Sequence, residues 1–313
     1  MICKKTSSRL VIIGNGFDLA HGYKTCYSDF IKNTKSKAVN QYQRSIQKHL
    51  EKNTLWYDFE ESIREMSGKA FQDRILTGNA NLNCKQINKY FHYLKIDLLK
   101  YLAKETSHSC KTKHSVNYWL QNAFVINFNY TKTVERYGIK PFYIHGNIDE
   151  ENSVLGYDFA GCNCTYSYDE TYYLKTFQRG ILSFHRLLKH FLFSPKTIKK
   201  YIKRYKYINM LADSPRGEVF YNHTLCDYII RLYRHWDIHH QKLTGYNCKN
   251  ITQIVIMGHG LKADECYLDS LFRECINLKE MVLFTYAGES RESIEEKQHF
   301  LQKYCPKIRI VNY

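Results

Sequence analysis

The sequence predicts an α/β fold: a Rossmann-like, mainly parallel sheet with helices on both faces and long helical insertions. Its apolar runs are continuous rather than alternating, as expected for strands that are covered on both faces. Helical stretches separate these runs, which is typical of a sheet with crossover helices. The runs expected to form strands are residues 10–14, 123–129, 142–146, 153–158, 253–260, 281–288 and 307–313.

The segments between these strands are expected to be helical. In residues 85–106, for example, Leu94 and Leu98 continue an apolar face begun by Ile87 and Phe91. The expected helices are 27–52, 58–70, 85–106, 263–273 and 290–304, with a further helical block at about 170–243 that is broken at Pro195 and Pro215. Segments 24–120 and 165–245 are too long for plain crossovers, so they are predicted to be helical insertions in a single domain spanning 1–313.

Composition favours an anionic partner. The 313 residues carry a formal charge of +16, which suits nucleotides, nucleic acid or acidic surfaces. The charge is spread along the chain, so a Lys-rich composition that only maintains solubility is an equal alternative. No apolar run is long enough to cross a membrane, and no secretory signal precedes Arg9. The 11 scattered cysteines therefore indicate a reducing cytoplasm without a disulfide framework.

The first strand ends on a turn that is suited to close approach. The run 10–18 reads LVIIGNGFD, so the strand passes directly into Gly14, Asn15, Gly16, Phe17 and Asp18. A Gly-x-Gly turn before a helix can bind an anion through backbone amides. Leu19 stands where the dinucleotide motif GxGxxG has its third glycine, so a plain strand–helix turn is an equal interpretation. The carboxylate of Asp18 repels phosphate and would suit a ribose hydroxyl or a backbone amide.

Small polar clusters also follow the other predicted strands. They are Asn127, Asn129, Tyr130 and Thr131; His145, Gly146 and Asn147; Gly156, Tyr157 and Asp158; and Gly258, His259 and Gly260, with Asp264 shortly after. The carboxyl ends of parallel strands line one crevice in an open α/β sheet, so we expect these residues to form one ligand pocket. His145 is the first catalytic candidate because, like His259, it titrates near neutral pH; the alternative is a histidine satisfied by backbone groups.

Other polar groups give weaker signals. Asp58 and Glu60 lie in the first turn of an expected helix, where carboxylates favour the helix dipole, or they reach the crevice to hold a ribose or a metal ion. Cys162 and Cys164 form a CxC pair without a second pair at zinc-finger spacing, so no metal site is predicted from them.

Several of these motifs together resemble the AbiH abortive-infection family of bacterial antiphage proteins. The matching stretches are GNGFDLAHGYKTCYSDF (14–30), WYDFE (56–60), NFNYTKTVERYG (127–138), YIHGNI (143–148), VLGYD (154–158) and MGHGLKADECYLDSLF (257–272). They occur in the family's order. Gly260 replaces the serine of the GHS motif that is common in the family.

The set is also similar, more distantly, to the sirtuin-like NAD-binding fold. His145 and Gly146 match its catalytic histidine motif, and Gly258 to Gly260 match its late turn. Asn129, Tyr130 and Thr131 resemble the N-Y-D turn of sirtuin-like defence enzymes, with Thr131 in place of aspartate. No zinc module is present, so this resemblance implies NAD hydrolysis or nucleotide binding rather than protein deacetylation.

The resulting hypothesis is an antiphage effector that binds a nucleotide, with NAD as the substrate, and hydrolyses it. Gly14 to Gly16 would cradle the pyrophosphate, and Asp18 or Asn129 would hold a ribose hydroxyl. His145 would act as general base, while His259 and Asp264 would line the adenosine side. A phage-derived trigger is expected, and self-association is left open.

Two other classes remain open. One is a metal-dependent nuclease or RNA-acting toxin, in which Asp18, Asp58, Glu60 and His145 would hold Mg²⁺ and the basic surface and tyrosines would bind nucleic acid. The other is a nucleotide-sensing switch without catalysis.

Overall fold

The computed structural model describes residues 7–33, 84–150, 153, 155, 186–187, 190–194, 196–197, 246–286 and 288–313. Its centre is a six-stranded sheet in which every pairing is parallel. The strands are β1 (Arg9–Ile13), β2 (Ala123–Asn127), β3 (Phe142–Tyr143), β6 (Gln253–Met257), β7 (Glu280–Thr285) and β8 (Ile308–Asn312). Two short strands, β4 (Phe191–Leu192) and β5 (Tyr246–Asn247), pair in parallel apart from this sheet.

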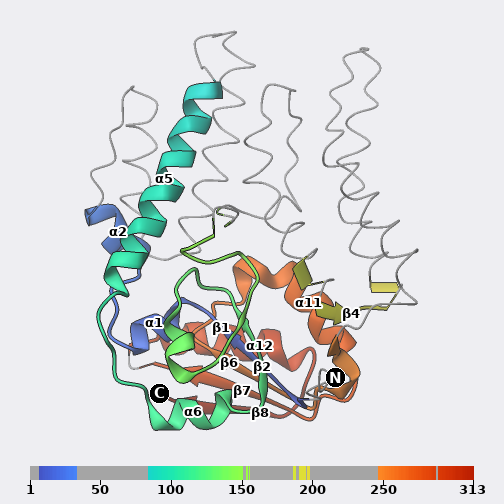
Figure 1. Cartoon of the computed structure of the whole chain (residues 1–313). Helices are drawn as coiled ribbons and strands as arrows, with labels where there is room; N and C mark the ends of the chain where they lie inside the picture. Colours follow the sequence, from blue (N-terminus) through green and yellow to red (C-terminus); the bar gives the residue numbers. More distant parts are fainter. Residues whose placement is uncertain are drawn as a thin grey trace, which may run out of the picture.

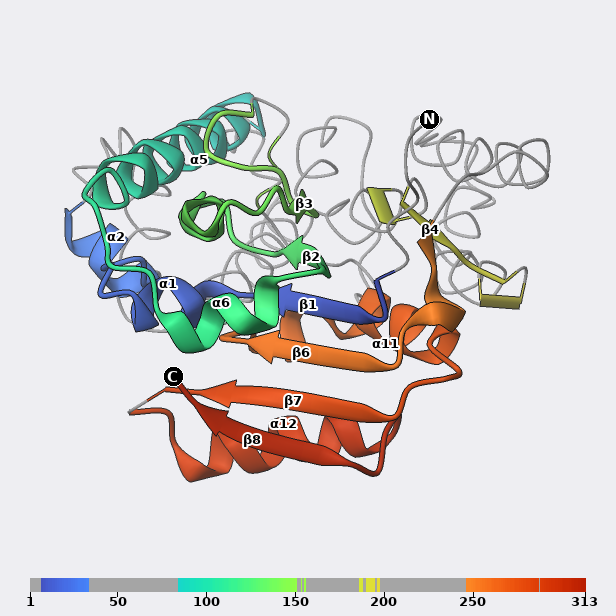
Figure 2. The ribbon, with the colours of Figure 1, turned by 60° about the horizontal axis from the view of Figure 1, so that its bottom comes forward.

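The strand order is β3-β2-β1-β6-β7-β8, which makes the sheet doubly wound. From β1 the chain builds β2 and β3 on one side, and β6, β7 and β8 follow on the other side (Figure 2). Such an order reverses between β1 and β6, and ligands of open α/β sheets bind outside the carboxyl ends of the strands at that point. The predicted Rossmann-like parallel sheet is therefore confirmed.

The strands are apolar without interruption because both faces of the sheet are covered. Successive side chains of a strand point to opposite faces. Leu10 and Ile12 of β1 join a core with α11 (Glu265–Glu274) and α12 (Arg291–Gln302), while Val11 and Ile13 join a second core with α6 (His114–Leu120).

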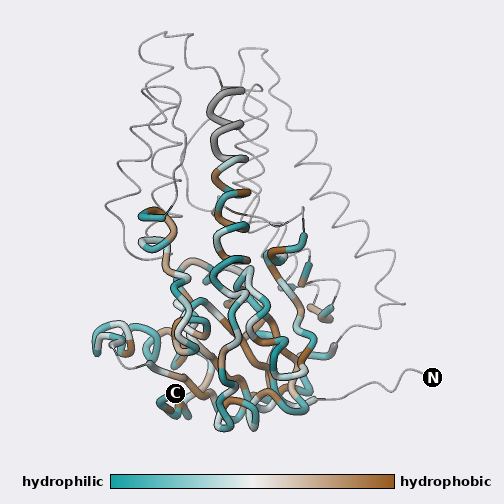
Figure 3. The backbone as a smooth tube through the Cα atoms, turned by 60° about the vertical axis from the view of Figure 1, so that its left-hand side comes forward, coloured by the Kyte–Doolittle hydropathy of each residue, from teal (hydrophilic) through white to brown (hydrophobic). Residues whose placement is uncertain are grey.

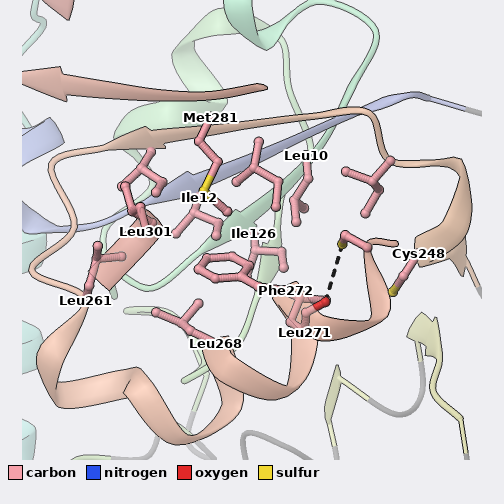
Figure 4. Packing of buried hydrophobic residues seen from close by; sticks show 14 of the residues in the cluster. Leu10, Ile12, Ile126, Cys248, Leu261, Leu268, Leu271, Phe272, Met281 and Leu301 are labelled. Carbon is pink, nitrogen blue, oxygen red and sulfur yellow. Dashed lines mark hydrogen bonds between the residues drawn. The ribbon is translucent and has the colours of Figure 1, made fainter. Parts of the chain in front are cut away.

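The first of these cores is the larger. In Figure 4, the side chains of Leu268 and Phe272 on α11 face the sheet, on the side to which β1 contributes Leu10 and Ile12. Figure 2 shows α11 and α12 behind the sheet and α6 in front of it. Hydrophobic segments accordingly run through the centre of the sheet-containing body in Figure 3.

The remaining described helices lie toward the carboxyl edge of the sheet or along it. They are α1 (Asn15–Ala20), α2 (Tyr27–Asn33) and α5 (Cys84–Glu105), with the 3-10 turns η1 (Thr133–Tyr137) and η4 (Lys262–Asp264). A third 3-10 turn, η3 (Cys248–Asn250), precedes β6 at the amino edge. The long helix α5 rises from the sheet-containing body in Figure 1. No helix among the described residues has the length and apolar character needed to cross a membrane.

Several predicted boundaries need correction. The strands expected at 123–129, 142–146 and 253–260 end earlier, at Asn127, Tyr143 and Met257. The last of these stops where Gly258 adopts a left-handed φ of 67°, which a strand cannot continue through. Helix α6 was not predicted at all.

Other predictions fall outside the described part of the chain. Of the strand expected at 153–158, only Ser153 and Leu155 are described, and neither belongs to a strand. The helix expected at 58–70, and most of those expected at 27–52 and 170–243, lie outside the described residues. The helices expected at 85–106, 263–273 and 290–304 are confirmed as α5, α11 and α12.

Candidate functional site

The turns that follow β1 and β6 touch each other through their backbones. Gly14 N donates to the carbonyl of Met257 at 2.9 Å, and Gly16 N donates to the carbonyl of Gly258 at 2.8 Å. A Cβ atom on Gly14 would lie 2.5 Å from the Cα atom of His259, and one on Gly258 would lie 2.2 Å from the nitrogen of Phe17. The glycines are therefore required for this close crossing.

The crossing changes what the first turn can offer a ligand. The amides of Gly14 and Gly16 are already bonded within the fold, and the amide of Phe17 donates to the carbonyl of Gly14 at 2.9 Å. Helix α1, which starts at Asn15, has six residues. A phosphate bound beside this turn would therefore depend on other donors, and the predicted pyrophosphate cradle stays a prediction.

Asp18 is completely buried beneath the turn after β2. Its Oδ2 accepts a hydrogen bond from Thr131 Oγ1 at 2.6 Å and one from Asn129 Nδ2 at 3.3 Å. Asn129 Nδ2 also donates to the carbonyl of Gly14 at 2.9 Å. Asp18 and Asn129, which we predicted to share a role, thus lie in one hydrogen-bonded cluster that joins the ends of β1 and β2.

The other carboxylate oxygen of Asp18 has no hydrogen-bond partner among the described residues, and neither has the buried hydroxyl of Thr133. Burial raises the pKa of Asp18 to about 6, and the hydroxyls of Thr131 and Thr133 oppose that rise. The Thr133 hydroxyl lies near the carboxylate without meeting hydrogen-bond geometry. Asp18 Oδ1 and the Thr133 hydroxyl are therefore two neighbouring buried groups that do not form a hydrogen bond.

Asn127, at the end of β2, shapes the turn that carries Asn129 and Thr131. Its Nδ2 donates to the carbonyl of Thr131 at 3.0 Å, and its Oδ1 accepts from the amide of Asn129 at 2.9 Å. We had grouped Asn127 with the strand-end polar residues without giving it this role. Its position as the last residue of an apolar run, two residues before Asn129, is the signal for an Asx-type turn.

Asp264 lies between two histidines. Its Oδ1 is 3.5 Å from His145 Nε2, and its Oδ2 is 3.0 Å from His259 Nε2. All three side chains are buried. His259 Nδ1 accepts a hydrogen bond from the amide of Leu261 at 2.9 Å, so the ring proton of His259 lies on Nε2 and points to Asp264. The ring of Phe128 packs edge-on against both histidines.

His145 is held by a loop that needs a glycine at its next position. Gly146 has a φ of 86°, and a Cβ atom there would lie 2.6 Å from Ser153 Oγ. The loop is tied to the turn after β2, because the amide of Ile148 donates to the carbonyl of Tyr130 at 2.8 Å. Ser153 therefore occupies the space where a side chain at position 146 would lie.

A cavity of about 130 Å³ lies among these elements. The predicted site residues that line it are Gly14, Asn15, Asp18, Asn129, Tyr130, Gly258, His259 and Asp264. Thr131 and Lys262 line it too, and we had not predicted Lys262. Residues from the ends of β1, β2 and β6 therefore meet around one space.

Four further predicted site residues are described but are not among those lining this cavity. Gly16 lies at the backbone crossing, and Phe17 points into the core on the α6 face of the sheet. His145 and Gly146 lie behind Asp264, so His145 reaches the cavity through that carboxylate. Gly156 and Asp158 lie outside the described residues.

Within the described part of the chain, no group of three or more His, Cys, Asp or Glu side chains could hold a metal ion. Asp18 and His145, which we considered as magnesium ligands, do not belong to such a group there. Asp58 and Glu60, the other two ligands of that hypothesis, and the Cys162–Cys164 pair lie outside the described residues.

The strand order and this strand-end cavity define the class of protein: a doubly wound α/β protein whose candidate site lies at the β1–β6 switch point. Residues 10–286 match the family model described as bacteriophage abortive infection AbiH, and the chain belongs to this family. Membership of this family implies a role in the abortive infection that bacteria use against bacteriophage. Searches of curated proteins and of solved structures gave no match. The similarity to sirtuin-like proteins stays a prediction.

Proposed function

We propose that this chain is an antiphage effector that binds NAD in the strand-end cavity and hydrolyses its nicotinamide–ribose bond. The observation that carries this proposal is the buried oxygen Oδ1 of Asp18, which lacks a donor among the described residues in a side chain that lines the cavity. A buried acceptor without a partner costs about 1 to 3 kcal/mol. A ribose hydroxyl would supply the missing donor and offset that cost.

The cavity fits part of such a ligand. Pockets that enclose drug-sized molecules have roughly 300 to 1,000 Å³, whereas this cavity has about 130 Å³. It has room for one ring-sized group rather than a whole dinucleotide. We therefore assign it to the ribose next to nicotinamide, with the rest of the ligand extending past Lys262, a cation at the cavity wall.

The charges around the cavity suit this chemistry. When the bond between C1′ and the nicotinamide nitrogen breaks, its electron pair leaves with nicotinamide and positive charge develops on the ribose. Carboxylates fixed beside that charge stabilise it without reorganising. Asp18 and Asp264 line the same cavity from the ends of β1 and β6 and would supply this stabilisation.

A water oxygen then bonds to C1′ and gives up a proton. We assign the general base to Asp264, which accepts the proton at the cavity wall, while His145 Nε2, 3.5 Å behind it, holds one oxygen of the carboxylate in place. His259 holds the second oxygen of Asp264 through its Nε2 proton. A positioned base of this kind typically contributes about a hundredfold to ten-thousandfold in rate.

The test follows nicotinamide release from NAD by the purified protein. His145→Ala should lower the rate by about a hundredfold to ten-thousandfold. His299→Ala, an exposed histidine on α12, makes the same chemical change away from the cavity and should leave the rate unchanged. Unchanged turnover in His145→Ala would remove that histidine from the mechanism.

The same variants should be compared in phage-infected cells by metabolite profiling, because a phage-derived trigger can be required for activity. Cells with the wild-type chain should lose NAD and accumulate nicotinamide, and cells with His145→Ala should not. Constant NAD in infected, protected cells would overturn the proposal. Degraded DNA or RNA with constant NAD would favour the nuclease hypothesis, and nucleotide binding without turnover would favour the non-catalytic switch.

A further inference from the structure

A second, larger concavity of about 660 Å³ lies along the opposite, amino-terminal edge of the sheet. We call it the amino-edge groove. Its lining comes from residues at or just before the starts of β1, β2, β6, β7 and β8, and from the end of α6: Ser8, Arg9, Tyr118, Gln121, Asn122, Thr252, Gln253, Lys279, Glu280 and Lys307. It shares no residue with the strand-end cavity.

The lining of the groove carries an excess of positive charge. Among the described residues that line the groove, Glu280 is the only acidic one. The carboxylate of Glu280 already pairs with Lys307 at 3.3 Å and with Arg309 at 3.5 Å. Lys279 is exposed and makes no ion pair within the described residues. The charge left over favours an anionic ligand.

Arg9 adds to this excess because its hydrogen bonds go to neutral groups. Its Nε donates to Gln253 Oε1 at 2.7 Å, and one terminal nitrogen donates to the carbonyl oxygens of Tyr118 and Trp119. These bonds fix the guanidinium in place without neutralising it. The groove therefore holds a positive charge that is positioned before any ligand arrives.

An aromatic ring stands exposed beside these cations. The side chain of Tyr118 is 65% exposed. The ring of Trp119 packs edge-on against it, with ring centroids 5.3 Å apart, and the guanidinium of Arg9 lies 5.4 Å from the Tyr118 ring. The ring is held by its neighbours yet open to a planar partner.

Single-stranded nucleic acid binds to grooves that combine cations with exposed aromatic rings. The amino-edge groove has both, with amide side chains beside them. The cations attract the phosphates, the ring stacks on a base, and Gln121 and Asn122 offer donors and acceptors. An acidic protein segment would satisfy the cations but would leave the exposed ring without a role. This favours nucleic acid over a protein partner.

We propose that the amino-edge groove binds single-stranded DNA or RNA, with Lys279 and Lys307 on phosphates and Tyr118 stacked on a base. Five neighbouring strand starts span about 19 Å at the usual spacing between strands, which is the rise of about five to six nucleotides at roughly 3.4 Å for each. That matches the smaller site sizes of single-strand-binding proteins. The inference does not depend on NAD hydrolysis and stands if that proposal fails.

The test measures binding of a fluorescent single-stranded oligonucleotide of about 12 residues, a length within known site sizes, between about 50 and 200 mM salt. The variant Lys279→Gln/Lys307→Gln should weaken binding and reduce the slope of log K against log salt by about 1.4, or about 0.7 for each phosphate contact. The control Lys100→Gln/Lys104→Gln makes the same charge change on exposed positions of α5 and should leave the slope unchanged.

The variant Tyr118→Leu separates nucleic acid from other polyanions. Loss of one stacked base should weaken oligonucleotide binding by about 5- to 150-fold without changing the salt slope. Polyglutamate, which has charge but no bases, should bind Tyr118→Leu and wild type equally. Loss of affinity in the α5 control to the same extent, or an unchanged oligonucleotide affinity in Tyr118→Leu, would overturn the proposal.

Discussion

Oδ2 of Asp264 lies 3.0 Å from Nε2 of His259, and this contact orients the carboxylate. Because Nδ1 of His259 accepts from the amide of Leu261, the ring has one proton arrangement that suits its surroundings, with Nε2 as the donor. Asp264 is thereby held with its other oxygen toward His145. The carboxylate of Asp264 is therefore a proton acceptor with a fixed orientation at the cavity wall.

Asp264→Asn should abolish most of the hydrolysis that we propose. The amide can still accept from His259 Nε2, but it cannot take up a proton, so kcat should fall by about a hundredfold to ten-thousandfold with little change in KM. Stability should fall, because the amide keeps only one of the two acceptor oxygens that face His145 and His259. Glu296→Gln, an exposed carboxylate on α12, is the matched control. Nicotinamide release and urea unfolding measure both effects.

Asp18→Asn should raise stability at neutral pH while it impairs ligand binding. Folding raises the pKa of Asp18 from 3.8 to about 6, so the folded state holds a proton that the unfolded state has released between these values. The contribution of Asp18 to stability is therefore full below pH 3.8 and is lost as the pH rises through 6. The loss amounts to about 3 kcal/mol, since one pKa unit corresponds to about 1.4 kcal/mol.

The measurement compares the free energy of unfolding of Asp18→Asn and wild type from about pH 4 to pH 8 by urea titration. The difference should turn in favour of the variant as the pH rises. Other titrating groups, such as His21, are present in both proteins and cancel. Parallel profiles over the whole range would contradict the prediction.

Gly258→Ala and Gly260→Ala should have opposite effects. A Cβ atom on Gly258 meets the nitrogen of Phe17 at 2.2 Å, and its φ is 67°, whereas a Cβ atom on Gly260 meets nothing within 4 Å. The left-handed backbone alone costs about 1 to 2 kcal/mol in alanine, and the overlap adds to that cost. Gly260→Ala should be neutral or should stabilise by about 0.4 to 1 kcal/mol. Thermal unfolding of the two variants checks the contrast.

Tyr137→Phe should destabilise the junction of α1 with the segment before α6. The hydroxyl of Tyr137 accepts from the amide of Lys113 at 2.8 Å and donates to His21 Nε2 at 2.5 Å. Its loss removes two hydrogen bonds to half-buried groups, at a cost of about 1 to 3 kcal/mol for both together. Tyr118→Phe is the control, because that hydroxyl makes no hydrogen bond within the described residues.

His21 adds a pH dependence to the same junction. Burial is the largest cause that lowers its pKa below 6.5, so the folded state favours the neutral ring. Its contribution to stability is present above pH 6.5 and is lost as the pH falls through the lowered value. In His21→Ala, this loss of stability on acidification should disappear; an unchanged acid limb of the stability profile would contradict it.

Local patterns were enough to predict the sheet. Residues 10–13 and 253–257 are continuous apolar runs, and such runs form strands that are buried on both faces whatever lies next to them. Helix α6 escaped prediction because its seven residues, HSVNYWL, are too few to show a helical period. It forms because Val116, Trp119 and Leu120 pack against the sheet, and packing of this kind stabilises helices too short to persist alone.

The candidate site could be predicted only as a set of residues. The polar clusters after the strands are visible in the sequence, and parallel topology brings strand ends to one edge. Which side chains pair there was not visible. Asp18 bonds to Thr131, 113 positions away, and His145 faces Asp264, so that His145 lies behind the cavity wall.

The sequence by itself determined the family, the parallel sheet and the strand ends at which a site would form, because these depend on the order of apolar and polar residues along the chain. Only the tertiary structure decided that Gly14, Gly16 and Gly258 serve a backbone crossing, that Asp264 links two histidines and that Asp18 keeps a buried acceptor without a partner. These features depend on close contacts between segments far apart in the chain, and packing of the whole sheet sets the distances of those contacts.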